Sequence, residues 1–332
     1  MKSYSLTHAF AATFLMLLGG LAATEVVHAQ SEAASAYPSR HITMILPYSA
    51  GGSGDKFGRI LGRAMEKRLG QPVVIEFKPG GGTNIGTDFV VHAKPDGYTL
   101  LLAGTPLTIN PFLYKKLPFS IDDLAPISIV SISPYLLVVG SSVPAKTLPE
   151  FIAYAKKNPD KVSYASAGIG SGAHMGGALL NLVAGLNMSH VPYKSSSQGL
   201  TDIIGGSVQM TLTPLVVGTP MVESGRLRAL AVTSLKRSKS LPNTPTIAEQ
   251  GYPRYEVLGW YGIMAPKATP PDILRKLNEV IVASLQEPDV VKALEVDGIE
   301  LKPGSPEEFA AFIKRTAADS AAFVKATGAT AE

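Results

Sequence analysis

Three glycine-rich clusters in this chain each stand between an apolar run and a segment with helical character. The first cluster, YSAGGSGDKFGR, follows HITMILP; the second, KPGGGTNIG, follows PVVIEF; and the third, SAGIGSGAHMGG, follows KVSYA. A glycine loop between a strand and a helix exposes the free backbone N–H groups of the helix start, where the helix dipole adds about half a positive charge. In open α/β sheets such loops gather at the carboxyl ends of the strands, where ligands bind. Tight turns would explain any single cluster, but three together favour a carboxylate-binding site.

The rest of the chain shows the alternation of an α/β fold. Asp55 is the expected N-cap of the helix that follows the first cluster. Short apolar runs predict strands at residues 42–46, 73–77, 98–103, 127–133, 136–140, 162–165, 190–193, 208–212, 227–233 and 255–266. Helical spacing and capping residues predict helices at residues 57–69, 85–93, 151–158, 172–184, 200–205 and 270–285, and a last helix that begins at Pro306.

Chain length and the lack of a linker set the domain organisation. With 332 residues the chain is long enough for about two domains, each with its own core. No low-complexity linker and no fixed-period repeat separates them, which suggests that the chain crosses between two lobes more than once. We place the crossings near Pro134 and near Tyr255. Lobe 1 would then hold residues 37–134 and 255–332, and lobe 2 residues 135–254.

The amino terminus has the pattern of a secretory signal. Lys2 and His8 precede an uncharged, mostly apolar run at residues 9–23, and small residues then lead to Ala29. The run is short for a stable membrane span, although an uncleaved anchor is the alternative. We predict a signal peptide at residues 1–29, cut after Ala29, with Ala36 as a second possible site, and a leader at residues 30–36.

Composition excludes several classes of protein. The chain is 45% hydrophobic and 17% charged, which excludes a disordered chain. Its net charge of +4 comes from lysines and arginines scattered among acids, so a nucleic-acid partner is not expected. An exported chain with no cysteine has no disulfide and no cysteine-linked lipid, and must depend on its core for stability. We expect a free, soluble protein outside the cytoplasm.

The glycine clusters fail the templates for nucleotide binding and for nucleophilic catalysis. A P-loop needs the pair Gly-Lys, which never occurs. Phe57 and Met175 stand where the dinucleotide fingerprint GxGxxG requires its third glycine. Neither Ser53 nor Ser171 stands in the GxSxG pattern of a nucleophile elbow. No cofactor is therefore expected, and a secreted α/β hydrolase using one of these two serines is an alternative of another class.

The remaining polar residues suggest neither a metal site nor a catalytic group. No HxxxH pair and no cysteine occur, so a closed zinc site is not expected. His174 lies one turn into the helix of the third cluster, where it would either face a ligand or make a packing contact. Trp260 and Tyr261 stand in an apolar strand and are expected in the core or at a hinge. We predict that the protein is not an enzyme.

Several ordered motifs make the chain similar to one known family. They include PYSAGGSGD, EFKPGGGTNIG, KPDGYTLLLAG, NPFLYKKLPFSIDDLAPIS, YASAGIGSGAHM, VPYKSSSQGLTDIIGGSVQM, RLRALAVTS and GWYGIMAPKATPPDILRKLN. From about Tyr37 to its end the chain resembles the Bug-type extracytoplasmic solute receptors of tripartite tricarboxylate transporters. The resemblance implies a two-lobed periplasmic binding-protein fold of type II-like α/β architecture, with a mixed sheet flanked by helices in each lobe and a ligand cleft between the lobes.

The resemblance also implies which residues hold the ligand. One carboxylate would lie between the first two glycine loops, bound mostly by backbone groups and bridging waters. Asp55 is expected to cap its helix instead of meeting the anion, because its own carboxylate would repel it. The implied ligand-binding residues are Tyr48, Gly51, Gly52 and Ser53 in the first loop, Gly81, Gly82, Thr83 and Asn84 in the second, and Ser166, Gly168, Gly170, Ser171, His174, Tyr193 and Thr213 in the other lobe.

Departures from the family pattern bear on the ligand. Thr213 stands where members commonly have an acid that can hold an ammonium group, which argues against an amino acid. Ser195, Ser196 and Ser197 replace glycines, and Ala178 replaces a frequent glutamate. These changes favour a neutral, hydroxyl-lined distal pocket and a dicarboxylate ligand, aliphatic or aromatic such as terephthalate. The expected role is that of a monomeric receptor delivering its ligand to membrane permease subunits; a receptor for a membrane signalling protein is the alternative.

Overall fold

The computed structural model describes residues 36–295 and 299–331. Backbone contacts separate residues 1–40 from residues 41–332, and the fold below is that of the second unit. The predicted signal peptide, its cut after Ala29 and the leader as far as residue 35 lie outside the described residues. No helix in the described part of the chain is both long and apolar enough to cross a membrane.

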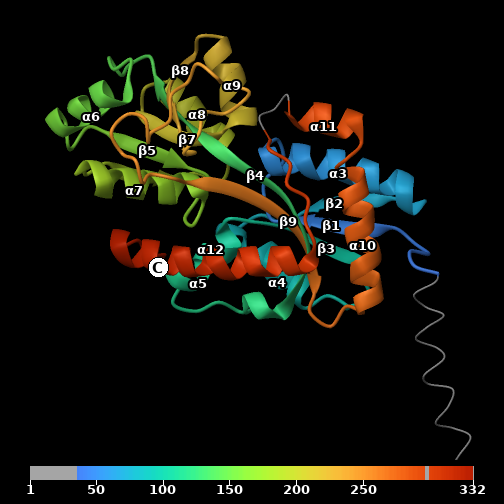
Figure 1. The fold of residues 1–332 in the computed structure, drawn as a ribbon. Coiled ribbons are helices and arrows are strands. Elements are labelled where there is room, and N and C mark those ends of the chain that lie inside the picture. The colour runs from blue at the N-terminus through green and yellow to red at the C-terminus, as the bar shows by residue number, and fades with distance from the viewer. Residues whose placement is uncertain (1–35, 296–298, 332) are drawn as a thin grey trace, which may run out of the picture. The chain divides into compact units, whose positions relative to one another are not determined.

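A nine-stranded mixed sheet forms the centre of the fold (Figure 1). Its hydrogen-bonded order is β2-β1-β3-β9-β4-β7-β5-β6, and β8 pairs with β4 outside this path. Pairing is parallel among β1, β2 and β3 and among β5, β6 and β7, whereas β4 and β9 run antiparallel to their neighbours. The strands are β1 Ile42–Leu46, β2 Val73–Phe77, β3 Thr99–Gly104, β4 Leu124–Gly140, β5 Ser163–Ser166, β6 Ser189–Pro192, β7 Met210–Pro214, β8 Leu227–Val232 and β9 Leu258–Pro266.

Ten α-helices occur in the described residues, and they cover both halves of the sheet. They are α3 Ser53–Leu69, α4 Asn84–Val91, α5 Pro106–Leu113, α6 Leu148–Lys157, α7 Gly172–Ala184, α8 Ser196–Ile204, α9 Leu215–Glu223, α10 Pro271–Ser284, α11 Pro288–Glu295 and α12 Pro306–Thr327. Short 3₁₀ helices lie at Gly81–Thr83 (η1) and Ile121–Asp123 (η2). Helix α3 shows why the sequence folds locally in this way: Phe57, Leu61 and Met65 recur at helical spacing and are fully buried, and Gly70 ends the helix with a φ of 67°.

The two longest strands join the halves of the sheet. β4 pairs with β9 as far as Pro134 and with β7 and β8 from Tyr135 onward. The sequence predicted two strands here, and this was wrong: a single strand of 17 residues runs through Pro134. Antiparallel pairing continues across the proline, with β9 up to Pro134 and with β7 and β8 beyond it, so the proline does not end the strand. The lobe boundaries inferred from the sequence stay a prediction.

Two apolar clusters form the main cores of the halves. In the first half, Trp260 and Phe309 pack edge to face, with ring centroids 5.7 Å apart, among buried side chains of β1, β3 and α12. In the second half, Phe151 and Tyr255 lie among buried side chains of β4, α6 and α7. Both clusters contain large side chains that are almost fully buried, and this burial is the main stabilising term available to a chain without cysteine.

Three helices were not predicted from the sequence, and one cap was predicted wrongly. The helices α5, α9 and α11 contain or begin with proline, which reads as a break in a sequence. Helix α3 begins at Ser53, so its N-cap is Gly52 and not Asp55. Asp55 lies instead in the first turn, where its Oδ2 accepts the backbone N–H of Gly51 at 2.8 Å. A carboxylate in this position is stabilised by the helix dipole.

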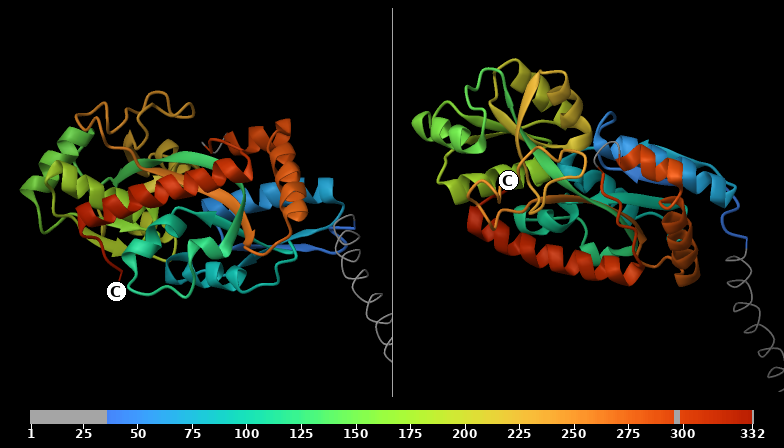
Figure 2. Two further views of the ribbon diagram at one scale, coloured as in Figure 1. Left: turned by 60° about the horizontal axis from the view of Figure 1, so that its bottom comes forward. Right: turned by 45° about the horizontal axis from the view of Figure 1, so that its top comes forward.

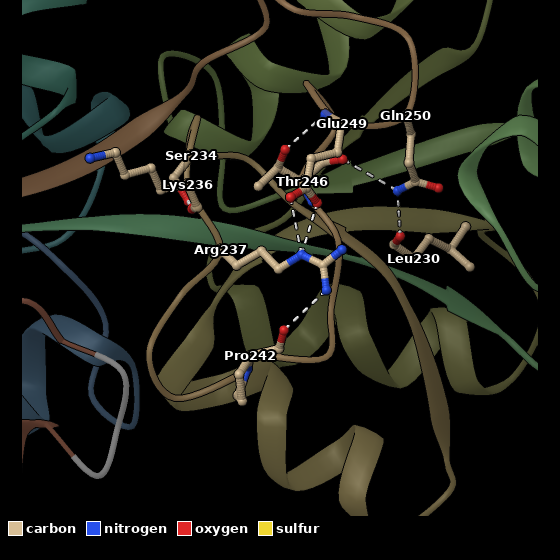
Figure 3. A network of polar contacts seen from close by, with 8 residues as sticks. All are labelled: Leu230, Ser234, Lys236, Arg237, Pro242, Thr246, Glu249 and Gln250. Atoms are coloured by element: carbon tan, nitrogen blue, oxygen red, sulfur yellow. Dashed lines mark hydrogen bonds and ion pairs between the residues drawn. The ribbon is translucent and has the colours of Figure 1, made fainter.

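The long connection between β8 and β9 is held by a polar network (Figure 3). Arg237 Nε donates to both carboxylate oxygens of Glu249, at 3.1 and 2.9 Å. Glu249 also accepts the backbone N–H of Thr246 at 2.9 Å, which with the arginine holds the pKa of this carboxyl below its usual value. Gln250 donates to the carbonyl of Leu230 in β8 at 3.0 Å. A connection without regular structure is thereby fixed to the sheet.

Helix α12 packs on α5 and β4 and reaches α7 (Figure 2). It begins at Pro306, as predicted, with a capping box in which Ser305 accepts the N–H of Glu308 and Glu308 accepts the N–H of Ser305. We expect Ser305→Ala to lower the free energy of unfolding by about 1 kcal/mol, because one N–H of the first turn loses its acceptor. Urea unfolding of the two proteins measures the difference. A midpoint equal to that of the unchanged protein would show that water replaces the cap at no cost.

Candidate functional site

A cavity of about 520 Å³ lies where the glycine loops meet, a size ordinary for a small-molecule site. All three loops contribute to it, together with residues of β4 and β9 near the point where β4 changes partner. Its lining includes Tyr48, Gly52, Ser53, Gly81, Gly82, Thr83, Thr105, Tyr135, Gly168, Ile169, Ser171, Tyr193, Lys194, Ser195, Ser196 and Tyr261.

The first loop presents an uncapped helix start to this cavity. Gly52, as the N-cap of α3, has no side chain to accept the first-turn N–H groups, and the N–H groups of Ser53 and Gly54 have no acceptor within the helix. A Cβ built on Gly52 would meet only Ser49 O, at 3.8 Å, so the space in front of it is open. Asp55 does not line the cavity; one carboxylate oxygen binds Gly51 and the other accepts Arg59 Nε. The loop therefore offers donors without a competing anion.

The second loop has an unusual backbone. Gly80, Gly81, Gly82 and Thr83 all have positive φ, at 124°, 56°, 63° and 81°. Thr83 is the one non-glycine residue with positive φ in the described part of the chain, and for a β-branched side chain this conformation is strained. Helix α4 starts directly after it. The run of left-handed residues turns the loop sharply, so that Gly81, Gly82 and Thr83 all face the cavity.

The third loop lies opposite and is braced by its own side chains. Ser171 caps α7 by accepting the N–H of His174 at 3.3 Å, and its hydroxyl donates to Gly168 O at 2.6 Å. The hydroxyl of Ser166 bonds with both the N–H and the carbonyl of Gly168, each at 3.1 Å. These bonds fix the turn from β5 into α7, where Gly168 and Gly170 have positive φ.

Two stacked histidines are hydrogen-bonded to the third loop and to Ser166 before it. The rings of His174 and His190 lie 4.1 Å apart, and Tyr164 stacks on the far side of His190 at 5.0 Å. His174 Nδ1 accepts the N–H of Gly170 at 3.3 Å, and His190 Nε2 bonds with the Ser166 hydroxyl at 2.6 Å. Burial lowers the pKa of His174 to about 4; burial, and then the proximity of His174, lowers the pKa of His190 to about 3. Both rings are therefore neutral near pH 7.

Tyrosine hydroxyls line the cavity beside the glycine loops. Tyr261 and Ser53 share a hydrogen bond of 2.7 Å, and the rings of Tyr48 and Tyr261 meet edge to face at 5.7 Å. Burial raises the pKa of Tyr48, Tyr135 and Tyr261, so these hydroxyls stay protonated and can donate. Either hydroxyl of the Ser53–Tyr261 pair can be the donor, which leaves one O–H of the pair for a ligand.

The electrostatics of the lining favour an anion. Among the described lining residues Lys194 is the one charged side chain, and none is Asp or Glu. The N-terminal residues of α3, α5, α7, α8 and α9 also line the cavity, so several helix dipoles point their positive ends at it. This arrangement can bind a small anion that has hydrogen-bond acceptors and no positively charged group.

The structure brings most of the predicted site residues to the cavity. Nine line it: Tyr48, Gly52, Ser53, Gly81, Gly82, Thr83, Gly168, Ser171 and Tyr193. Six do not: Gly51, Asn84, Ser166, Gly170, His174 and Thr213. Ser166, Gly170 and His174 support the third loop from behind, as described above. The hydroxyl of Thr213 is buried without a partner, and its methyl group lies against Gly218 of α9. The ligand role of all fifteen stays a prediction.

Sequence reasoning missed Tyr135 and Tyr261 as lining residues. Both stand in apolar strands, and the pattern gave no sign of which side chain faces a cavity. The available signal was glycine on neighbouring elements, where a large side chain can pack closely against the backbone. A Cβ on Gly172 or Gly259 would lie 2.2 or 2.7 Å from the Tyr135 hydroxyl. Glycine in a strand marks such a close approach.

Serine, histidine and acidic side chains are the groups in and near the site that could catalyse a reaction or bind a metal ion. No group of three or more His, Cys, Asp or Glu in residues 36–295 and 299–331 could hold a metal ion. Ser166 and His190 form a serine–histidine pair, but Ser166 is 2% exposed and is held by the loop backbone. Ser53 bonds with a tyrosine, and Ser171 is used as a helix cap. The hydrolase alternative requires Ser53 or Ser171 as its nucleophile. In these contacts neither hydroxyl is bonded to a histidine side chain.

Comparisons with known proteins agree with this geometry. Residues 57–329 match the family model described as the tripartite tricarboxylate transporter family receptor. Protein BugT of Bordetella pertussis is 37% identical over 299 residues, which cover 89% of this chain and 92% of BugT. The structure of the periplasmic binding protein BugD has a TM-score of 0.85 at 35% identity, over 89% of this chain and 100% of that chain. The structure of R. palustris Rpa4515 with adipate has a TM-score of 0.86 at 30% identity, over 89% of this chain and 99% of that chain.

The family model and the relatives cover most of the described residues. The structural likeness confirms the α/β fold of a two-lobed periplasmic binding protein, which the sequence motifs had implied. The chain belongs to the tripartite tricarboxylate transporter receptor family, whose members are solute-binding receptors.

Proposed function

We propose that this protein captures a small organic dicarboxylate in the periplasm and delivers it to the membrane permease subunits of a tripartite tricarboxylate-type transporter. One observation carries the proposal: the cavity is lined by open helix starts and protonated hydroxyls, with one lysine and no acid. One carboxylate would lie between the first and second glycine loops and accept their backbone N–H groups. The Rpa4515 structure with adipate supports a carboxylate as ligand.

The distal part of the cavity favours a second acceptor group over an ammonium group. Lys194, Ser195 and Ser196 line the cavity, and no Asp or Glu stands among its described lining residues to hold a cation. Apolar side chains such as Leu212, Leu215 and Val216, and the aromatic rings described above, also line the cavity. Such a wall suits an aliphatic or an aromatic spacer, so adipate-like acids and terephthalate are both within the proposed class.

The two halves of the fold would act as lobes that close on the ligand by a hinge. We propose lobe 1 as residues 37–134 and 255–332 and lobe 2 as residues 135–254. The partner change of β4 between Pro134 and Tyr135 supports the first crossing point. The monomeric state, and export by a signal peptide cut after Ala29, are part of the same proposal.

The contacts of Ser53 and Ser171 favour a binding protein over a hydrolase. A secreted hydrolase would need a serine whose hydroxyl is activated by a histidine at the cavity, and Ser53 and Ser171 are otherwise engaged. A receptor for a membrane signalling protein would use the same ligand site. Capture of membrane proteins with and without adipate separates the two: permease subunits support transport, and a sensor protein supports signalling.

Isothermal titration calorimetry on protein refolded without ligand tests the proposal. The titrants are adipate, malate and terephthalate, with glutamate as a matched acid that carries an ammonium group. We expect at least one of the three dicarboxylates to bind with a Kd in the micromolar range or below, and glutamate to bind more weakly than that acid. Folded protein that binds none of the three, or that prefers glutamate, would contradict the proposed ligand class.

A further inference from the structure

Asn110 connects the second and third glycine loops, although it does not line the cavity. It lies on α5, which packs against η1 and against α12; Figure 1 shows α5 beside α12. Its side chain is 1% exposed. Its Nδ2 donates to the carbonyl of Gly82 at 2.8 Å and to Asn84 Oδ1 at 2.7 Å. Both hydrogens of this amide are therefore used to hold the second loop.

The loop that Asn110 holds needs outside support. Four successive residues, Gly80 to Thr83, have positive φ, and the last is a strained threonine. Such a backbone persists only where its surroundings hold it in place. Within the loop, the N–H of Thr83 donates to Gly80 O at 3.0 Å, which leaves the carbonyl of Gly82 to an outside donor. Asn110 provides that donor at the residue that faces the cavity.

The other end of the same carboxamide meets the third loop. Asn110 Oδ1 is buried and has no hydrogen-bond partner. A Cβ built on Gly170 would lie 2.3 Å from this oxygen, so the backbone of the third loop stands directly against it. The orientation of the amide is fixed, because turning it over would bring Oδ1 to the carbonyl oxygen of Gly82. One planar group thus meets two loops from opposite halves of the sheet: it is hydrogen-bonded to the second loop and in contact with the third.

We infer that Asn110 is a positioning residue for the ligand site, one that sets the shape of the second glycine loop and the distance at which the third loop meets it. The expected effect of Asn110 on ligand affinity rests on the proposed function. Its effect on the second loop does not depend on any ligand. The third loop covers the unpartnered Oδ1 of Asn110, so water can bind this oxygen only if the third loop moves away. Approach of the loops therefore leaves an acceptor unsatisfied, and ligand binding must offset that cost.

The test compares Asn110→Asp with Asn278→Asp. Asn278 on α10 is a matched control, because its Nδ2 also donates to two acceptors, Ile127 O at 2.8 Å and Gly304 O at 2.9 Å, and it does not line the cavity. The Asp side chain has the size of Asn but, when ionised, donates to neither acceptor. Hydrogen exchange of the full chain without ligand, read at residues 80–86, is the first measurement, and the Kd for adipate, malate and terephthalate is the second.

We expect Asn110→Asp to speed exchange at residues 80–86 by about tenfold or more, and to weaken binding of whichever of the three acids binds the unchanged protein by a similar factor. Asn278→Asp should lower the thermal midpoint without either change. Equal exchange at residues 80–86 in Asn110→Asp and the unchanged protein, or an equal increase in Asn278→Asp, would overturn the inference. If none of the acids binds the unchanged protein, the proposed function fails while the exchange measurement still decides the role of Asn110.

Should Asn110→Asp fail to fold, Asn110→Ser gives the same test, since it keeps a small polar side chain that is too short to reach both acceptors. The same increase in exchange at residues 80–86 is expected. An Asn110→Ser variant with the exchange rates of the unchanged protein would overturn the inference as well.

Discussion

Gly52→Val is expected to weaken ligand binding by about a hundredfold while the fold persists. The φ of Gly52 is −92°, which any residue adopts, and a Cβ there meets only Ser49 O at 3.8 Å. The valine side chain would project into the open space before the N–H groups of Ser53 and Gly54. Loss of two charge-assisted hydrogen bonds corresponds to about 3 kcal/mol or more, and so to about a hundredfold weaker binding. Calorimetry with the acid that binds the unchanged protein measures the loss.

Gly205→Val is the matched control for that substitution. Gly205 also has an ordinary φ, −72°, and a Cβ there makes only ordinary contacts, with Thr201 O at 3.5 Å and Asp202 O at 3.7 Å; it lies at the end of α8, outside the cavity. We expect this variant to bind the acid as the unchanged protein does. Equal binding by Gly52→Val and Gly205→Val would show that the carboxylate does not lie against the first loop.

Gly82 is a poorer position for the same test. Its φ is 63°, and a Cβ there would lie 2.6 Å from the Tyr114 hydroxyl and 3.0 Å from Ile169 O. A valine would therefore strain the second loop and push the two halves of the sheet apart, so loss of binding would not distinguish a blocked site from a damaged fold. The structure thus separates two substitutions that appear equivalent in the sequence.

Acid is expected to destabilise the protein through the stacked histidines. The pKa values of His174 and His190 are lowered in the folded protein to about 4 and about 3, whereas an unfolded histidine titrates near 6.5. Between pH 6.5 and about 4 the unfolded chain therefore binds protons that the folded chain does not. The free energy of unfolding must fall as the pH falls through this window, by up to about 1.4 kcal/mol per pH unit for each histidine.

His190→Phe isolates this effect from the titration of carboxylates. The phenyl ring keeps the stack on Tyr164 and His174 but loses the bond to the Ser166 hydroxyl, so the variant should be less stable at pH 7.5 by about 1 kcal/mol. Between pH 7.5 and 5 it should lose less stability than the unchanged protein. Urea unfolding at both pH values gives the comparison. Parallel pH dependence of the two proteins would mean that the histidines do not titrate in the expected way.

The sequence predicted most strands well because their apolar residues are continuous and their ends carry clear signals. β1 and β2 have the predicted bounds, and α7 begins and ends where the third cluster and Ala184 placed it. The sequence-based prediction failed at prolines, which indicate a break although a strand or helix can continue through them. Pro134 lies inside a strand because β9 pairs with the strand before it and β7 pairs with the strand after it, and Pro111 lies inside α5, which packs against α12 and β3. Tertiary pairing of this kind leaves no local mark in a sequence.

The candidate site was predicted from loops more easily than from side chains. Glycine clusters identify a backbone that a ligand can approach, and most of their residues do line the cavity. Tyr135, Tyr261 and Asn110 reach the site from strands and a helix that the sequence did not relate to one another. Their positions depend on how β4, β9 and α5 pack, and single-residue properties do not specify that packing. Asp55 shows a subtler limit: its carboxylate does bind at the start of α3, but two residues inside the helix.

A crystal structure of the protein grown with the dicarboxylate that binds most tightly in calorimetry would show directly how the ligand is held. We expect one carboxylate between the first two loops, with its oxygens within hydrogen-bond distance, about 2.7–3.2 Å, of backbone N–H groups at Gly52–Gly54 and at Gly81 and Gly82, directly or through one water. We also expect the second carboxylate to lie toward Lys194 and the serines beside it. An acid bound elsewhere, or an occupied cavity in which neither glycine loop contacts the carboxylate, would contradict the proposed site.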